Sequence, residues 1–231
     1  MLFRSGTKTV ALHAGTADRI AVTARTAGGE RDPQGITIFL VDAAAPGVTM
    51  TDYPTVDGLR AGDVTLAGVR VGKDAVLGDV DGGLDLAERV IDRAAALAAA
   101  EAAGIMGALT RGTADYLKER RQFGRPLGDF QALQHRAAEM YVETELTRSL
   151  AYMAAVRQDG RDHATARRAA SQAKAKAGQA GRLIGQEAVQ LHGGMGVTDE
   201  MPVGHYFKRL TMIDHSFGDR AHHLERLAEK S

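Results

Sequence analysis

The chain of 231 residues contains no cysteine, no tryptophan and only five prolines. Without cysteine there can be no disulfide, no thiolate metal ligand and no cysteine nucleophile. Basic and acidic residues both number 29, so the formal net charge is zero. This balance gives no support for a surface that binds nucleic acid or an anionic membrane.

Long hydrophobic runs are also missing. No segment approaches the ~20 apolar residues of a membrane span. The N-terminal sequence MLFRSGTKTVALHAGTAD lacks the apolar core of a secretion signal. The absence of cysteine agrees with a reducing compartment, and we therefore expect a cytoplasmic protein without a membrane span.

The first 80 residues have the pattern of antiparallel β structure. Short runs rich in Val, Ile and Thr are separated by turn residues, and no helical pattern lies between them. The expected strands cover residues 8–14, 19–26, 35–43, 48–56 and 62–71. We predict a partial β-sandwich over residues 1–80, with an edge that needs a cover.

The pattern becomes helical after Gly82, where alanine, the best helix former, is abundant. The expected helices cover about 84–121, 131–157, 164–191, 203–215 and 219–230. The second should bury Leu133, Ala137, Met140, Leu146, Leu150 and Met153. The third should bury Ala169, Ala173, Ala177, Ala180, Ile184 and Leu191, whose mostly small size allows close helix packing. We predict an α+β protein whose second domain, residues 81–231, is a bundle of four or five helices.

Two motifs combine groups that can bind anions. In RRQFGRPLGDFQ (120–131), two arginines at a helix end could grip a phosphate or merely complement the helix dipole. In QLHGGMGV (190–197), the glycines could cap a helix or let backbone N–H groups approach a pyrophosphate. The second motif does not follow a strand and lacks G-x-G-x-x-G, which excludes a dinucleotide-binding fingerprint.

The stretch IDHSFGDRAHH (213–223) gathers residue types found in active sites and metal sites. Its histidines lack the H-E-x-x-H pattern, and we predict no metal site. Ser-His-Asp triads are assembled from distant segments, so local crowding does not indicate one. At helical spacing, His215 and His222 share a face while His223 points elsewhere, and we expect a polar turn followed by one face of the last helix.

Taken together, the motifs resemble the acyl-CoA dehydrogenase family. RRQFGRPLGDFQALQHRAAEM and AVQLHGGMGVTDEMPV are similar to two signatures of that family, in its order and spacing. YFKRL…FGD lies where the family's last active-site loop should be, and KTVALHAGTADRIAVTART…GITIFLVD resembles part of its central β domain. The resemblance covers essentially the whole chain.

The resemblance implies a flavoenzyme with bound FAD that assembles into tetramers built from dimers. In the family a glutamate removes the α-proton of an acyl-CoA, the β-hydride passes to the flavin, and the electrons pass to an electron-transfer flavoprotein. The family also has an N-terminal helical domain before the sandwich. Because this chain starts inside the β domain, the resemblance implies an N-terminally truncated member.

The resemblance also implies FAD contacts in two segments, which in the family reach the FAD of the neighbouring subunit. The matching residues are Arg120, Gln122, Phe123, Gln131, Gln190, Gly193 and Gly194. An anion arriving across a subunit interface would then explain the arginines at the end of the helix.

The glutamate that serves as the family's catalytic base is missing. Its position falls on Phe217, which cannot accept a proton. The base position of some relatives, on the first bundle helix, falls on Ala94, with Asp92 and Glu88 nearby but out of register. Asp219 is an alternative carboxylate, provided that it lies close to the proton to be removed.

The C-terminal segment resembles most the small, base-less subunit of heteromeric acyl-CoA dehydrogenases that act on pimeloyl-CoA or on sterol-CoA esters. The leading hypothesis is an FAD-dependent acyl-CoA dehydrogenase polypeptide, a non-catalytic subunit or fragment that is inactive alone and pairs with a larger subunit. One alternative is a structural protein that completes a partner's FAD pocket without turnover. Another is a related flavin fold, such as an acyl-CoA oxidase or a flavin monooxygenase.

Overall fold

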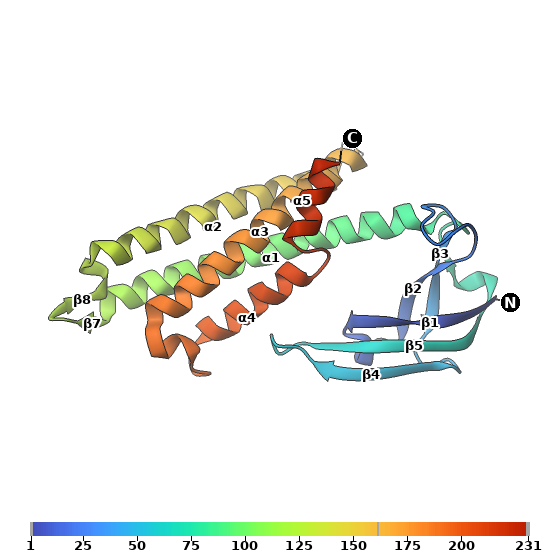
Figure 1. Cartoon of the computed structure of the whole chain (residues 1–231), viewed down its shortest axis with the longest axis horizontal. Coiled ribbons are helices and arrows are strands. Elements are labelled where there is room, and N and C mark those ends of the chain that lie inside the picture. The colour runs from blue at the N-terminus through green and yellow to red at the C-terminus, as the bar shows by residue number, and fades with distance from the viewer. Residues whose placement is uncertain (1, 161, 230–231) are drawn as a thin grey trace. The chain divides into compact units, whose positions relative to one another are not determined.

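The computed structural model describes residues 2–160 and 162–229 (Figure 1). The chain divides into two compact units, Met1–Val90 and Ile91–Ser231. Among the described residues, no helix is both long and apolar enough to cross a membrane.

The first unit consists mainly of two antiparallel sheets of three strands each. One has the order β1-β5-β4, with strands at Leu2–Leu12, Arg60–Val71 and Val48–Pro54. The other has the order β2-β3-β6, with strands at Arg19–Arg25, Ile36–Asp42 and Val76–Leu77. The predicted strands are all present, whereas β6 was missed because two residues carry no recognisable period.

The two sheets bury one common hydrophobic core. Val22 and Phe39 contribute from the β2-β3-β6 sheet, and Val64 and Leu66 from the β1-β5-β4 sheet. Phe39 and Val64 are fully buried. A core formed by the facing sides of two sheets is the arrangement of a sandwich, which confirms the predicted partial β-sandwich.

The second unit is a helical bundle, as predicted. Its helices are α1 (Gly83–Glu119, which begins in the first unit), α2 (Gln131–Gln158), α3 (His163–His192), α4 (Pro202–His215) and α5 (Arg220–Ala228). Between α1 and α2 the chain forms a small hairpin of β7 (Arg121–Gln122) and β8 (Arg125–Pro126), where the sequence predicted only a loop. Figure 1 shows α1, α2 and α3 running side by side, and buried residues from all three form one core.

The inner face of α2 differs in part from the prediction. Met140 is fully buried, but Leu146 is 49% exposed, so its placement in the buried stripe was wrong. Thr144 and Thr147 lie inside instead. The Thr144 hydroxyl donates to the Met140 carbonyl oxygen and also bonds Thr110 of α1, at 2.8 and 2.9 Å. A threonine can be buried because such bonds satisfy its hydroxyl group.

Helix α3 has glycines where α4 packs against it. A β-carbon added at Gly185 would lie 2.4 Å from Cδ2 of Phe207 on α4. At Gly181 the nearest atom, Met106 Cε, would lie 3.4 Å away, an ordinary contact. The alanines predicted to be buried on α3 are buried, which confirms the close packing expected from their size.

Gly181→Ala and Gly185→Ala should therefore act in different directions. Both gain about 1 kcal/mol of helix propensity, but only Gly185→Ala collides with a packed ring, at a cost of about 1–3 kcal/mol. We expect urea unfolding followed by circular dichroism to show Gly181→Ala at least as stable as the wild type and more stable than Gly185→Ala. Equal stabilities of the two variants would contradict the packing of α4 on α3.

Candidate functional site

The hairpin after α1 presents an aromatic ring and several cations to the outside. Phe123 at its tip has a left-handed backbone (φ 55°), and the residue is 87% exposed. Its ring meets that of Phe130 edge-on, with centroids 6.1 Å apart, while the Arg125 guanidinium carbon lies 3.9 Å from the Phe130 centroid. Arg120 and Gln122, both predicted FAD contacts, are exposed beside this tip.

The glycine turn after α3 leaves its backbone accessible. Gln190 is exposed on the last turn of α3, and the 3-10 helix η4 (Gly193–Val197) follows directly. Gly193 has φ 61° and ψ −140°, a conformation open essentially only to glycine. A β-carbon on Gly193 or Gly194 would meet nothing within 4 Å. A ligand can therefore approach this main chain closely.

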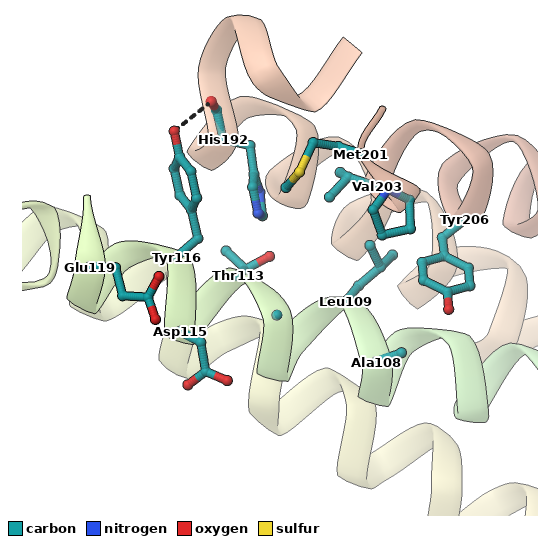
Figure 2. Close-up of a pocket in the computed structure, with 12 residues that line it drawn as sticks. Ala108, Leu109, Thr113, Asp115, Tyr116, Glu119, His192, Met201, Val203 and Tyr206 are labelled. Carbon is teal, nitrogen blue, oxygen red and sulfur yellow. Dashed lines mark hydrogen bonds between the residues drawn. The ribbon is translucent and has the colours of Figure 1, made fainter. Parts of the chain in front are cut away.

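The hairpin and the glycine turn lie at the same end of the bundle (Figure 1). Tyr116, one turn before Arg120, stacks on His192 with ring centroids 4.3 Å apart. Its hydroxyl donates to the His192 carbonyl oxygen at 3.3 Å, directly before the glycine turn (Figure 2). An ion pair of 2.5 Å between Arg136 and Glu187 also joins α2 to α3 near this end.

A hollow of about 260 Å³ lies between α1 and the start of α4 (Figure 2). Its walls are mostly apolar and include Leu109, Met201 and Val203. Tyr116 and His192 also line it, and the His192 ring is held by a 2.8 Å bond between Nδ1 and the Ala188 carbonyl oxygen. The hollow thus offers apolar surface, whereas the cationic groups lie on the hairpin.

The chemistry of this end suits the diphosphate and adenosine part of FAD. Exposed guanidinium groups form paired charge-assisted hydrogen bonds with phosphate oxygens. The Gly193 N–H donates to the Gln190 carbonyl oxygen, but the next main-chain N–H of the glycine turn can still attract an anion. An exposed aromatic face can stack on a base. Gln131, the seventh predicted contact, is exposed at the first position of α2.

The loop that carries Phe217 lies at the other end of α4. Helix α4 has 14 residues, which corresponds to about 21 Å at 1.5 Å per residue. Phe217 and Gly218 both have left-handed backbones, with φ 57° and 93°. Phe217 as a whole residue is 40% exposed. The loop therefore presents a phenyl ring at the position where the resemblance expects a glutamate.

Lys174 of α3 lies beneath this loop and is fully buried. Its Nζ donates to the carbonyl oxygens of Asp214 and Gly218, at 2.9 and 2.8 Å. Burial lowers the pKa of Lys174 to about 8, although the nearby carboxylates of Asp214 and Asp219 oppose this shift. Lys174 was missed in the sequence, but its i+4 spacing from buried Ala170 signalled a lysine on the inner face of α3.

His223 of α5 is also fully buried, so the expectation that this stretch forms only a polar turn and helix face was wrong for this residue. Its Nε2 lies 3.1 Å from the Phe217 carbonyl oxygen, and its Nδ1 lies 3.2 Å from Ser171 Oγ. A carbonyl can only accept, which assigns the proton to Nε2 and leaves Nδ1 to accept from Ser171. Burial, and next the positive charge of Lys174, lower the pKa of His223 to about 4.

The candidate carboxylates have structural partners. Asp219 caps α5, where its Oδ1 accepts from the His222 backbone N–H at 2.9 Å, and this bond lowers its pKa. Asp92 is buried and pairs with Arg226 at 2.8 Å and with Arg167 at 3.6 Å. Ala94, the alternative base position, and Glu88 are partly buried on α1. Within residues 2–160 and 162–229, no group of three or more His, Asp or Glu could hold a metal ion.

The buried His223 should make stability depend on pH. The pKa of His223 in the folded chain lies below the ordinary value of 6.5. Between pH 6.5 and 4 the histidine is therefore protonated in the unfolded chain but neutral in the folded chain. The free energy of unfolding thus falls as the pH drops through this range. We expect the wild type to lose up to about 2 kcal/mol more than His223→Gln between pH 7 and 5. Urea unfolding at the two pH values tests this, and equal losses would contradict it.

Comparisons with known proteins identify one family and several similar chains. The family described as "Acyl-CoA dehydrogenase, C-terminal domain" matches residues 81–231. The chain is 32% identical over 214 residues to the mitochondrial short-chain specific acyl-CoA dehydrogenase of Bos taurus, covering 90% of this chain and 51% of that protein. It is 31% identical over 207 residues to the caffeyl-CoA reductase-Etf complex subunit CarC of Acetobacterium woodii, covering 88% and 54%.

Among solved structures, the chain is similar to one in the ChsE4-ChsE5 complex from Mycobacterium tuberculosis. The TM-score is 0.87 and the sequence identity 29%, covering 99% of this chain and 60% of that one. The chain thus spans about half the length of the curated relatives it matches.

Proposed function

The chain belongs to the acyl-CoA dehydrogenase family, and from that premise we propose that it is the base-less chain of an FAD-dependent assembly. The assembly would introduce a double bond between the α and β carbons of an acyl-CoA thioester. Members of this family bind FAD. The chain spans about half the length of its relatives, and we propose that the catalytic base comes from a second chain of the assembly.

The proposal depends on one observation, the contrast between the two ends of α4. At one end, the seven residues that match FAD contacts are exposed in two adjacent segments. At the other end, Phe217 lies where the sequence resemblance expects the base, and Asp219 is engaged as a helix cap. This combination suits a chain that contributes cofactor-binding groups but no proton acceptor.

Each group at the cofactor end has a role that its chemistry allows. Arg120 would pair with the diphosphate, the main-chain N–H at Gly194 would bind the same anion, and the Phe123 ring would cover the adenosine. The Gly193 N–H already donates to the Gln190 carbonyl oxygen, so Gly193 would contribute open space for the ligand. When bound, FAD supplies the oxidant that accepts the β-hydride. Phe217 has no lone pair with which to accept the α-proton, so a carboxylate of the partner chain would take it.

We further propose a larger acyl-CoA dehydrogenase subunit as the partner and an electron-transfer flavoprotein as the electron acceptor. The similarity to a chain of a two-protein complex supports the heteromer. The similarity to a subunit named for a complex with Etf supports the acceptor. A dicarboxylic or sterol acyl-CoA is the substrate class that the sequence resemblance favours.

Co-expression tests this function. The chain should carry no flavin absorbance when purified alone, but should copurify with a larger family member encoded beside it as a yellow complex that oxidises an acyl-CoA with an artificial acceptor. A chain that holds FAD alone and turns over acyl-CoA would contradict the base-less assignment.

Arg120→Ala should weaken FAD retention by this complex. A charge-assisted phosphate contact contributes about 1.5–3 kcal/mol, so we expect a rise of at least roughly tenfold in the Kd for FAD, with the Tm of the chain nearly unchanged. The control is Arg168→Ala, which removes an exposed arginine of α3 outside the two cofactor segments. Equal flavin occupancy in both variants would contradict the assignment of Arg120.

A further inference from the structure

The loop between α4 and α5, residues 216–219, has an unusual backbone. Phe217 and Gly218 are consecutive residues in the left-handed region. For a residue with a side chain this conformation costs about 1 kcal/mol and persists only where the surroundings enforce it. At Gly218 even a β-carbon is excluded, because it would lie 2.4 Å from the His222 ring.

Buried groups on two helices hold this backbone. His223 Nε2 donates to the Phe217 carbonyl oxygen, and Lys174 Nζ donates to the carbonyl oxygen of the next residue, Gly218. Lys174 also donates to the carbonyl oxygen of Asp214, in the last turn of α4. The Ser171 hydroxyl, one helical turn from Lys174, orients the His223 ring.

Burying the Lys174 ammonium group costs free energy, which hydrogen bonds to the loop and to the end of α4 offset. Removing an ammonium group from water costs several kcal/mol unless hydrogen bonds and charges compensate. Here the compensation comes from the carbonyl oxygens of Asp214 and Gly218, from the nearby carboxylates of Asp214 and Asp219, and from the negative end of the α4 dipole. If the loop moved away, Lys174 would lose the Gly218 carbonyl as an acceptor.

We propose that Lys174 is a positioning residue that, together with His223, fixes the main chain of the α4–α5 loop and so holds the residue at position 217 in one place. The relevance of the loop to acyl-CoA chemistry rests on the proposed function. The anchoring itself is a property of the chain and is testable without a partner or a cofactor.

Because the chain has no tryptophan, a tryptophan introduced into the loop would be its only indole. In Phe217→Trp the single indole reports the mobility and exposure of the loop through quenching of its fluorescence by acrylamide. Adding Lys174→Met, which keeps most of the side chain but removes its donors, should raise the quenching constant roughly twofold well below the Tm, because the loop opens locally while the bundle stays folded. Lys174→Gln retains an amide donor and should give an intermediate value.

Lys176→Met is the matched control. Lys176 lies two residues away on the same helix and pairs with Glu143 of α2 at 2.6 Å. Its removal should lower the Tm without changing the quenching of the indole in the Phe217→Trp reporter. Quenching that is unchanged in Lys174→Met, or raised equally in Lys176→Met, would overturn the proposal. Lys174 would then contribute to the overall stability of the bundle without anchoring the loop.

A second reporter covers the case in which Lys174→Met does not fold. The chain has no cysteine, so Phe217→Cys creates a single thiol whose labelling rate measures access to the loop. This rate should rise in Phe217→Cys with Lys174→Gln, and an unchanged rate would also overturn the proposal. Flavin retention by the Arg120→Ala complex tests the proposed function separately, so the two failures are distinguishable.

Discussion

The close packing of α4 on α3 is the constraint on which both functional regions depend. Gly178, Gly181 and Gly185 face Asp214, Leu210 and Phe207 in antiparallel order. Helix α4 connects the glycine turn at its beginning to the Phe217 loop at its end. A larger side chain at Gly178 or Gly185 would displace α4, and with it the turn that exposes its backbone and the loop anchored by Lys174.

The hairpin and the α4–α5 loop differ in where their charged groups lie. The hairpin carries cations and an exposed phenylalanine, and these groups lie in contact with water. The α4–α5 loop is supported from inside by two fully buried ionisable residues with lowered pKa values. The first arrangement favours association with an anion that comes from outside. The second favours fixed geometry, because a buried polar group that loses its partner is expensive.

The sequence predicts most of the fold because the strands and helices have clear periods. The exceptions have local causes. The two-residue strands β6, β7 and β8 are too short to show a period. Leu146 lies at helical spacing but outside the buried face, which two threonines occupy by bonding their hydroxyls within the bundle.

The site is less predictable from the residues alone. Arg120 at a helix end has a simple explanation in the helix dipole, and only the family resemblance singled it out. Lys174 and His223 are 49 residues apart and meet through the packing of α3 and α5. No local pattern indicates that both would bond the same loop, although the lysine on an otherwise small and apolar face was a visible signal.

The anchoring of the α4–α5 loop has a consequence for how such a chain can change. Both anchors bond carbonyl oxygens, and neither touches the side chain at position 217 through a hydrogen bond. The loop is thus held through main-chain atoms of Phe217 and Gly218, whereas the side chain at position 217 takes no part in these bonds. Position 217 could therefore accept a different side chain while the same hydrogen bonds kept the shape of the loop.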